Sequence, residues 1–516
     1  MSTAINPYDQ VEYHAGTFSK THPQRLASVA RLFGLNTPSV ERCRVLELGC
    51  GDGANLIPMA YHMRNCQFVG IDLAQTPIDA GTRRVRRLGL SNVQMLQADV
   101  AQLGDTLGQF DYIIAHGLYS WVPDSVRPHI LRVAQELLTE NGVAYISYNA
   151  LPGCRLRHLV RELLQFRFGE HAFDPSRINE VRNFLREFAS VESTSSNSFQ
   201  SALKAEIDFV QQIPDFVLFH DDLAEYSKAF YLHEFLAQAK QHQMQYLGEA
   251  TIHEMLTLAG HEAFDEALSQ WSNDDWISRE QYLDFCKGTR FRQTLLCREH
   301  HRLDRRIDAQ SILSFQLRTA LLPLNAAQTV FDRQTMTFGG TQRNIELTEP
   351  IAKLAIVRLG EQYPSTISFD LLFADVFSAC RVQGIDYEDD SARAATLKLI
   401  WALVRADQIE LIRDPVIASR TYDRLPEVTS LVADALVHKE PLSGSLHRRF
   451  ELQDQVANQL TLTMDGTRSL HDLSAAFRLL NAQSGIGESS ADADGATEKV
   501  RGLITFLHRQ GALRAG

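Results

Sequence analysis

Apolar runs alternate with amphipathic stretches over the first 150 residues of the chain. Five short apolar runs predict strands, at 44–48, 67–72, 93–98, 111–115 and 142–148. Helical periodicity predicts helices in the intervals, at 54–63, 76–88 and 127–138. Such alternation is typical of a parallel sheet with helices on both faces. We therefore expect an α/β fold with a doubly wound, Rossmann-like sheet.

A further helix is predicted before the first strand. Residues 21–24, with Thr21 and Gln24 at its ends, match a capping box, and an apolar face follows at Leu26, Val29, Ala30 and Phe33. We interpret His22 as a residue of this helix start rather than as a catalytic base.

The alternation stops after residue 150. A basic, leucine-rich amphipathic stretch at 155–168 opens a longer helical region. The remaining elements of the sheet are predicted at 231–243 (helix), 244–248 (strand) and 292–297 (antiparallel final strand). We therefore expect one domain over residues 1–300 that carries a helical insertion at about 155–230.

The last third of the chain predicts an accessory α+β region. Residues 301–345 suggest a connector with a small strand element. Helices at 349–363 and 392–406 and a strand at 409–412 suggest a winged-helix-like unit. A second copy is expected at 446–513, with a helix at 470–480 and a polar, glycine-rich loop at 482–496 that is expected to be disordered. Because no Lys/Arg stripe runs along 346–516, protein docking or dimerisation is favoured over DNA binding.

Glycines and acidic residues mark the ends of the first three strands. Gly49, Gly51 and Gly53 follow the first strand at alternate positions, where they permit a tight turn and close approach of a ligand. The helix that follows offers a positive dipole end to a carboxylate or phosphate. The pattern therefore predicts a nucleotide-like cofactor at the carboxyl end of the first strand.

Acidic residues help to choose the cofactor. Gly49, Gly51 and Ala54 also fit the looser dinucleotide pattern, which leaves nicotinamide or flavin open. Glu47 and Gly53 favour S-adenosylmethionine, because Glu47 can order the loop or meet the ammonium group of this cofactor. Asp72, 21 residues after Gly51, suits ribose hydroxyls. Asp99 ends the third strand and suits the adenine amino group.

Motifs beyond the glycine loop carry a family resemblance. They are Tyr8-Asp9, Tyr13, THPQRL at 21–26, IPMA at 57–60, HGLYSWVP at 116–123, YNALPG at 148–153, YLHEF at 231–235, QYLGEA at 245–250 and RFRQTLL at 290–296. With these motifs the chain resembles the class I S-adenosylmethionine-dependent methyltransferases. Within that class it is similar to the bacterial branch with a methyltransferase regulatory domain, which includes rickettsial outer-membrane-protein lysine methyltransferases. The resemblance places the regulatory segment at about 215–300, where it overlaps predicted core strands.

Site residues follow from the strand ends and from the resemblance. The expected cofactor contacts are Glu47, Gly49, Cys50, Gly51, Gly53, Asp72, Leu73, Asp99, Val100 and His116. The expected methyl-transfer pocket comprises Tyr119, Trp121, Tyr13 and Tyr148, since aromatic faces can hold a lysine cation. Tyr8 is expected to join Tyr13 in a lid. Cys50 is interpreted as a small tolerated side chain, and no metal site is expected.

Composition fits a multi-domain cytoplasmic enzyme. At 516 residues the chain exceeds a single core. It has no apolar run of the roughly 20 residues that a membrane span needs, and no signal peptide is recognised at its start. The seven cysteines form no C-x-x-C pair, which disfavours a zinc site or a disulfide framework. The net charge of −12 disfavours nucleic acid and suits a lysine-rich partner.

Three functions remain open from the sequence. The first is a protein lysine methyltransferase, with accessory domains that dock a protein substrate and support a homodimer through the C-terminal region. The second is a small-molecule O-, N- or C-methyltransferase. The third is a non-catalytic scaffold, which the filled cofactor positions disfavour. An oxidoreductase is disfavoured by the downstream motifs.

Overall fold

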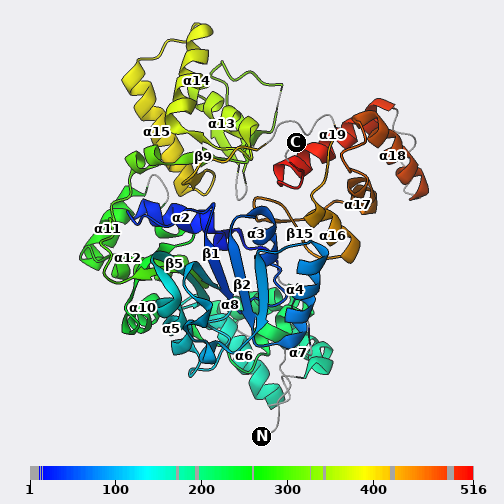
Figure 1. The fold of residues 1–516 in the computed structure, drawn as a ribbon. Coiled ribbons are helices and arrows are strands. Elements are labelled where there is room, and N and C mark those ends of the chain that lie inside the picture. Colours follow the sequence, from blue (N-terminus) through cyan, green and yellow to red (C-terminus); the bar gives the residue numbers. More distant parts are fainter. Residues whose placement is uncertain are drawn as a thin grey trace.

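A central sheet of eight strands organises the first 300 residues of the computed structural model (Figure 1). The structure describes residues 11, 13, 16–169, 174–191, 197–257, 261–325, 327–340, 344–418, 425–484 and 493–514. The strands are β1 (Arg44–Leu48), β2 (Gln67–Asp72), β3 (Val93–Gln97), β4 (Phe110–Ala115), β5 (Leu138–Ala150), β6 (Ala229–Phe230), β7 (Met244–Glu249) and β8 (Phe291–Arg298). Their order is β3-β2-β1-β4-β5-β8-β7, with β6 paired to β5.

Strand directions confirm the predicted doubly wound sheet. The first five strands run parallel to one another. As expected from the sequence, β8 runs antiparallel to both of its neighbours, β5 and β7. The carboxyl ends of β2, β1 and β4 therefore lie next to one another, and these are the ends that carry the predicted site residues.

Apolar side chains cover both faces of the sheet. Val45 and Tyr112 belong to one apolar cluster, whereas their neighbours Leu46 and Ile113 belong to the other. Strands buried on both faces are continuous apolar runs, which explains the pattern in the sequence. The covering helices are α2 (Pro23–Leu32) and α3 (Leu56–His62) on the first face, and α5 (Arg127–Leu137) and α10 (Leu232–Gln241) on the second. Helix α4 (Gln75–Arg87) packs against β2 and β3.

The start of α2 differs from the predicted capping box. The N-cap is His22, whose Nδ1 accepts a hydrogen bond from the Gln24 amide at 3.2 Å. Pro23 occupies the first helical position, where its missing N–H is tolerated. Thr21 instead donates its hydroxyl to the Phe18 carbonyl at 2.8 Å. The capping-box prediction was wrong, whereas the placement of His22 at the helix start is confirmed.

The helical insertion has a small core of its own. It contains α6 (Arg155–Phe168), α7 (Ile178–Ser190), α8 (Ser198–Gln212), α9 (Asp215–Val217) and a π-helical turn (Leu218–Asp222). Val160, Leu164, Val181 and Leu185 are buried together in this core. Helices α11 (Glu262–Ser272) and α12 (Trp276–Lys287) lie between β7 and β8 in the chain.

The first C-terminal unit begins earlier than expected. Its three-stranded sheet has β9 (Gln316–Arg318) between β13 (Ile367–Ser368) and β14 (Glu410–Ile412). The expected connector 301–345 therefore supplies the central strand of this unit, as well as β10 (Leu322–Pro323), β11 (Met336–Gly339) and β12 (Ile345–Leu347). The helices are α13 (Pro350–Gln362), α14 (Phe369–Val382) and α15 (Asp389–Arg405). The winged-helix interpretation stays a prediction.

The second C-terminal unit differs from the first in element order. It contains α16 (Ser430–His438), a hairpin of β15 (Leu442–Ser443) and β16 (Arg449–Phe450), and then α17 (Gln455–Leu462), α18 (Leu470–Gln483) and α19 (Ala493–Arg509). Residues 485–492 of the expected polar loop lie outside the described residues. Figure 1 shows the first C-terminal unit above α2 and the second beside α3 and α4. Among the described residues, no helix has the length and apolar character to cross a membrane.

Candidate active site

The glycine loop between β1 and α3 has one packed side and one open side. Gly49, Gly51 and Gly53 have φ angles of 72°, 54° and 76°, a conformation that residues with side chains rarely adopt. A side chain at Gly53 would meet Ile57 Cδ1 at 2.9 Å, whereas one at Gly51 would meet no atom within 4 Å. The open side at Gly51 can therefore accept a ligand against bare backbone.

Hydrogen bonds within the loop fix its shape. The amides of Gly49 and Cys50 both donate to the Ile71 carbonyl, at 2.8 and 3.0 Å. The Gly51 amide donates to Asp72 Oδ2 at 2.9 Å. Burial raises the pKa of the Cys50 thiol well above its ordinary value, so this side chain stays neutral and packs in the interior. The loop is thus held by β2 and by its acidic end residue.

Acidic and apolar groups lie together at the ends of β2 and β3. Asp72 also accepts the Ala74 amide through Oδ1 at 2.9 Å, and the neighbouring Leu73 is 59% exposed. Asp99 Oδ1 accepts the Ala101 amide at 2.9 Å, which caps the turn that begins at Val100. This edge therefore combines carboxylates with exposed apolar surface, as a ribose and an adenine ring require.

Glu47 is buried at the end of β1. Its Oε1 accepts a hydrogen bond from Asn55 Nδ2 at 2.7 Å. Burial raises the pKa of Glu47 to about 8. The second oxygen, Oε2, is buried with no hydrogen-bond partner in the described part of the chain. Of the two roles expected for Glu47, this geometry favours ordering of the loop over direct contact with a ligand.

His116 follows β4 next to the glycine loop. Its Nδ1 lies 2.9 Å from the Tyr145 hydroxyl, and the Phe18 ring lies over it with centroids 3.8 Å apart. Burial, together with nearby Lys20, lowers the pKa of His116 to about 4. The imidazole is therefore neutral at physiological pH. The following amide, of Gly117, donates to the Ser147 hydroxyl at 2.8 Å.

Three residues of this site were missed by sequence reasoning. Asn55 directly follows the glycine loop, so its position was a usable signal. Phe18 covers His116 and donates its amide to Asn55 Oδ1 at 3.0 Å, and Phe291 meets His116 edge-on at 5.9 Å. Phe291 lies in the motif at 290–296 but was assigned no role there, and Phe18 lies in no motif. The N-terminal segment thus forms one wall of the site.

Two of the predicted catalytic aromatics lie in the interior. Tyr119 is fully buried and donates its hydroxyl to Gln238 Oε1 at 2.7 Å. Tyr148 is also fully buried, with its hydroxyl 3.1 Å from Thr294 Oγ1 and its ring 4.3 Å from that of Phe235. Both rings lie in the apolar cluster beneath α10. Their burial favours a packing role, and it corrects the expectation that they wall the pocket.

The other two predicted aromatics are half-buried. Trp121 lies in the turn after β4, where its amide donates to the Leu118 carbonyl at 2.9 Å. Tyr13 meets Phe216 and His220 of the insertion edge-on, at 5.4 and 5.5 Å. The N-terminal segment is therefore anchored on the insertion at Tyr13. Tyr8 lies outside the described residues.

Comparisons with known proteins show the family of the chain. A methyltransferase-domain model matches residues 45–142, and a predicted methyltransferase regulatory-domain model matches residues 214–298. The Rickettsia prowazekii protein RP028 is 33% identical over 234 residues, which cover 45% of this chain and 94% of that protein. The chain belongs to the S-adenosylmethionine-dependent methyltransferases.

Two further relatives of this methyltransferase extend the likeness. The Rickettsia prowazekii protein RP789 is 35% identical over 370 residues, which cover 70% of this chain and 66% of that protein. The structure of PKMT2 from Rickettsia typhi in complex with AdoHcy matches with a TM-score of 0.86 at 23% identity. That match covers 97% of this chain and 99% of PKMT2, so the fold is shared from the sheet to the C-terminal units.

The regulatory-domain segment is part of the methyltransferase sheet. It contains β7 and β8, and β8 forms the ladder with β5 from Ala144–Leu296 to Asn149–Phe291. Removing this segment would expose the edge of β5. The segment therefore completes the fold, which explains why the sequence placed core strands inside it.

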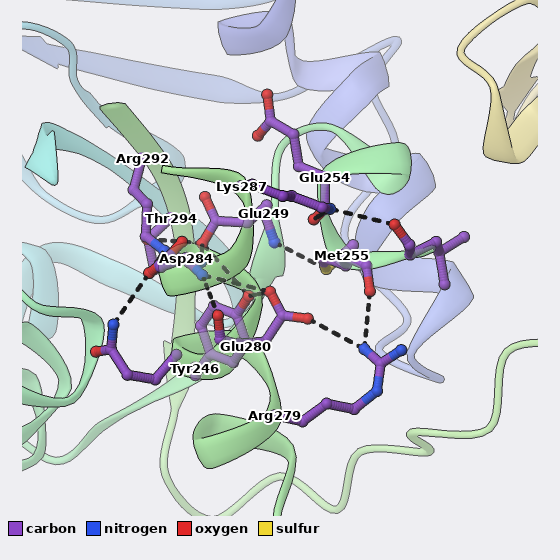
Figure 2. Close-up of polar contacts among 12 residues, drawn as sticks. Tyr246, Glu249, Glu254, Met255, Arg279, Glu280, Asp284, Lys287, Arg292 and Thr294 are labelled. Carbon is purple, nitrogen blue, oxygen red and sulfur yellow. Dashed lines mark hydrogen bonds and ion pairs between the residues drawn. The ribbon is translucent and has the colours of Figure 1, made fainter. Parts of the chain in front are cut away.

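A charged cavity of about 530 Å³ lies beyond the end of β7. Its lining includes Glu249, Glu254, Asp284, Lys287, Arg292 and Arg405. Figure 2 shows Arg292 surrounded by carboxylates: Nη1 lies 2.5 Å from Glu249 Oε1 and Nε lies 2.9 Å from Asp284 Oδ2. Burial raises the pKa of Glu249 to about 7. Lys20, which lies two residues after Phe18, pairs with Glu254 of the cavity lining at 3.2 Å.

Proposed function

We propose that this methyltransferase transfers methyl groups to lysine side chains of a protein substrate. Two observations support the proposal: the fold match to PKMT2, which includes both C-terminal units and the insertion, and the resemblance of the sequence motifs to rickettsial lysine methyltransferases. A compact small-molecule acceptor needs no such accessory units.

The residues at the strand ends fit S-adenosylmethionine. In this proposal Asp72 holds the ribose hydroxyls, Leu73 and Val100 pack on adenine, and Asp99 accepts from its amino group. The open side of Gly51 lets the cofactor lie against the loop. The bound cofactor supplies a methyl group that its sulfonium already activates.

The protein must then align the acceptor and exclude water. Phe18, His116 and Phe291 surround the end of β4 with aromatic surface. A lysine amine that enters this surface loses hydration, which lowers its pKa and favours the reactive neutral form. His116 is neutral and does not add a competing charge. Trp121 and Tyr13 remain proposed contacts of the acceptor.

Labelled methyl transfer tests the proposal. The enzyme is incubated with radiolabelled S-adenosylmethionine and a lysate of the source organism, and protein and small-molecule fractions are separated. We expect label in a discrete protein band that is stable to base and maps to lysine. Label confined to small molecules would instead indicate the alternative small-molecule methyltransferase. The Asp72→Ala variant serves as the control for cofactor-dependent label.

We also infer a cytoplasmic location and a homodimer formed through the C-terminal region. The cytoplasmic inference rests on the seven cysteines, which are scattered and form no C-x-x-C pair. The dimer inference rests on the accessory units alone, and gel filtration with light scattering tests it against the 58.2 kDa mass of one chain.

A further inference from the structure

A loop of the second C-terminal unit reaches the glycine loop of the methyltransferase core. His447 lies in the hairpin between β15 and β16 and is 1% exposed. Its Nε2 lies 2.8 Å from Oδ1 of Asn55, which directly follows the glycine loop. A residue of the accessory region is therefore part of the hydrogen-bond network around the cofactor site.

Asn55 contacts three separate segments through one amide: the N-terminal segment, β1 and the β15–β16 hairpin. Its Oδ1 accepts from the Phe18 amide at 3.0 Å and faces His447. Its Nδ2 donates to Glu47 Oε1 at 2.7 Å and to Thr21 Oγ1 at 3.1 Å. Because a backbone N–H can only donate, Oδ1 must be the atom that faces Phe18 and His447. The Nε2 of His447 therefore carries the hydrogen and donates to Asn55.

The surroundings of His447 keep it a neutral donor. Burial lowers the pKa of His447 well below its ordinary value, and nearby His22 and His62 act in the same direction. The other ring nitrogen, Nδ1, is buried without a hydrogen-bond partner among the described residues. The imidazole thus makes one directed hydrogen bond, and that bond is to Asn55.

The hairpin that carries His447 is fixed to the rest of its unit. A side chain on Gly444 would meet the Gln510 carbonyl oxygen at 2.0 Å, so the hairpin lies directly on the end of α19. The backbone amide of Ser445 donates to the Gly511 carbonyl at 3.0 Å. The backbone amide of His447 donates to the Gly444 carbonyl at 2.9 Å. His447 has a φ of 53°, a conformation that non-glycine residues adopt only when the surroundings impose it.

We propose that His447 is a positioning residue of the cofactor site, through which the second C-terminal unit sets cofactor affinity. His447 holds the Asn55 amide, Asn55 holds the Glu47 carboxyl, and this chain keeps the glycine loop in its binding shape. The inference rests on the proposed function only in that S-adenosylmethionine is the ligand; it needs no assumption about the methyl acceptor. The second C-terminal unit would thus take a direct part in cofactor binding by the methyltransferase core.

Calorimetric binding of S-adenosylhomocysteine to the full chain tests the proposal without a methyl acceptor. His447→Leu removes the donor, His447→Asn retracts it from Asn55, and His447→Gln places an amide N–H near the original Nε2 position. We expect the dissociation constant to rise about tenfold in the Leu and Asn variants, which corresponds to about 1.4 kcal/mol. The Gln variant should recover most of the affinity.

A matched control separates positioning from docking. Tyr61→Phe removes the 2.8 Å contact with Ser430, which also joins the second unit to the core but lies outside the Asn55 network. This variant should bind as the unchanged chain does. Unchanged affinity in folded His447→Leu, or equal losses in His447→Gln and His447→Asn, would overturn the proposal. Failure of labelled transfer with normal cofactor binding would instead count against the proposed substrate.

Discussion

The carboxyl group of Glu47 is buried, and burial disfavours its charged form. Its pKa is raised from 4.5 to about 8, so the folded chain holds a proton that the unfolded chain releases between these values. Glu47 therefore lowers the stability of the folded state as pH rises from about 4.5 to 8, and its effect is constant outside that window. The thermal midpoint of the unchanged chain should fall across this window for this reason.

Glu47→Gln tests this linkage. The variant keeps an oxygen acceptor for Asn55 Nδ2 but does not titrate. Between pH 5.5 and 8.5 its thermal midpoint should fall less than that of the unchanged chain, by about 2–4 °C. Scanning calorimetry at both pH values measures the difference. Parallel midpoints would show that Glu47 keeps the same protonation in the folded and unfolded states.

Asp72 joins the glycine loop to the ribose position. Asp72→Ala removes both the acceptor for the Gly51 amide and the proposed ribose contact. We expect at least a tenfold rise in the dissociation constant of S-adenosylmethionine, with the fold retained, because the loop keeps its bonds to Ile71. Titration calorimetry and circular dichroism measure the two properties. Unchanged binding in a folded variant would remove Asp72 from the ribose site.

Site residues were predictable from sequence only where local geometry demands a residue type. The positive φ angles at Gly49, Gly51 and Gly53 strongly favour glycine at those positions, and glycines are directly visible in the sequence. Asn55 and His447 meet through tertiary packing across 392 positions, and either residue alone resembles an ordinary polar residue. Tyr119 was misplaced because a strand end leaves open whether the next side chain points into the core or out of it.

At the scale of elements, β8 depends on a buried ionic cluster. Arg292 is 3% exposed and pairs with Glu249 and Asp284, while its Nη2 donates to the Glu280 carbonyl at 3.1 Å (Figure 2). Removing only the cation would leave buried carboxylates without their partner. We therefore expect Arg292→Met to destabilise the fold by about 3–5 kcal/mol.

A double variant distinguishes charge from packing at this cluster. Adding Glu249→Gln to Arg292→Met removes one of the unpaired carboxylates, so it should restore part of the lost stability. Denaturant unfolding followed by circular dichroism measures both variants. An Arg292→Met chain as stable as the unchanged one would show that the cluster does not hold β8 in the sheet.

Long apolar runs made the core elements predictable, whereas short elements escaped detection. The strands β1, β2 and β4 have buried residues on both faces, which gives a continuous signal over five or six residues. By contrast, β9 has three residues and owes its strand conformation to β13 and β14, which lie about 50 and 90 positions later in the chain. The helix α2 starts at Pro23 rather than one residue earlier, because proline chemistry fixes the first turn.

At the scale of the whole molecule, arginines join the three main parts. Arg413 at the end of β14 bonds the first C-terminal unit to the segment after α2, with Nη1 at 2.6 Å from Thr37 Oγ1 and 3.2 Å from the Pro38 carbonyl. Arg509 of α19 donates to the carbonyls of Gly360 and Ala320, at 3.1 and 2.8 Å, and so joins the two C-terminal units. Removing either arginine takes a charged donor away from part-buried acceptors at the junction.

Arg413→Ala should loosen the first C-terminal unit without disturbing the cofactor site. The substitution removes the charged donor of Thr37 and Pro38, whose acceptors then keep only the Tyr112 hydroxyl, at a cost of about 1–3 kcal/mol. Hydrogen exchange should therefore accelerate in β14 and α2. The glycine loop should exchange as before, because His447 of the other unit holds Asn55 next to it. Arg393→Ala is the matched control, because Arg393 pairs with exposed Asp370 inside the same unit, and such surface pairs contribute little. Faster exchange at Gly49–Gly53 in Arg413→Ala would show instead that both C-terminal units support the cofactor loop.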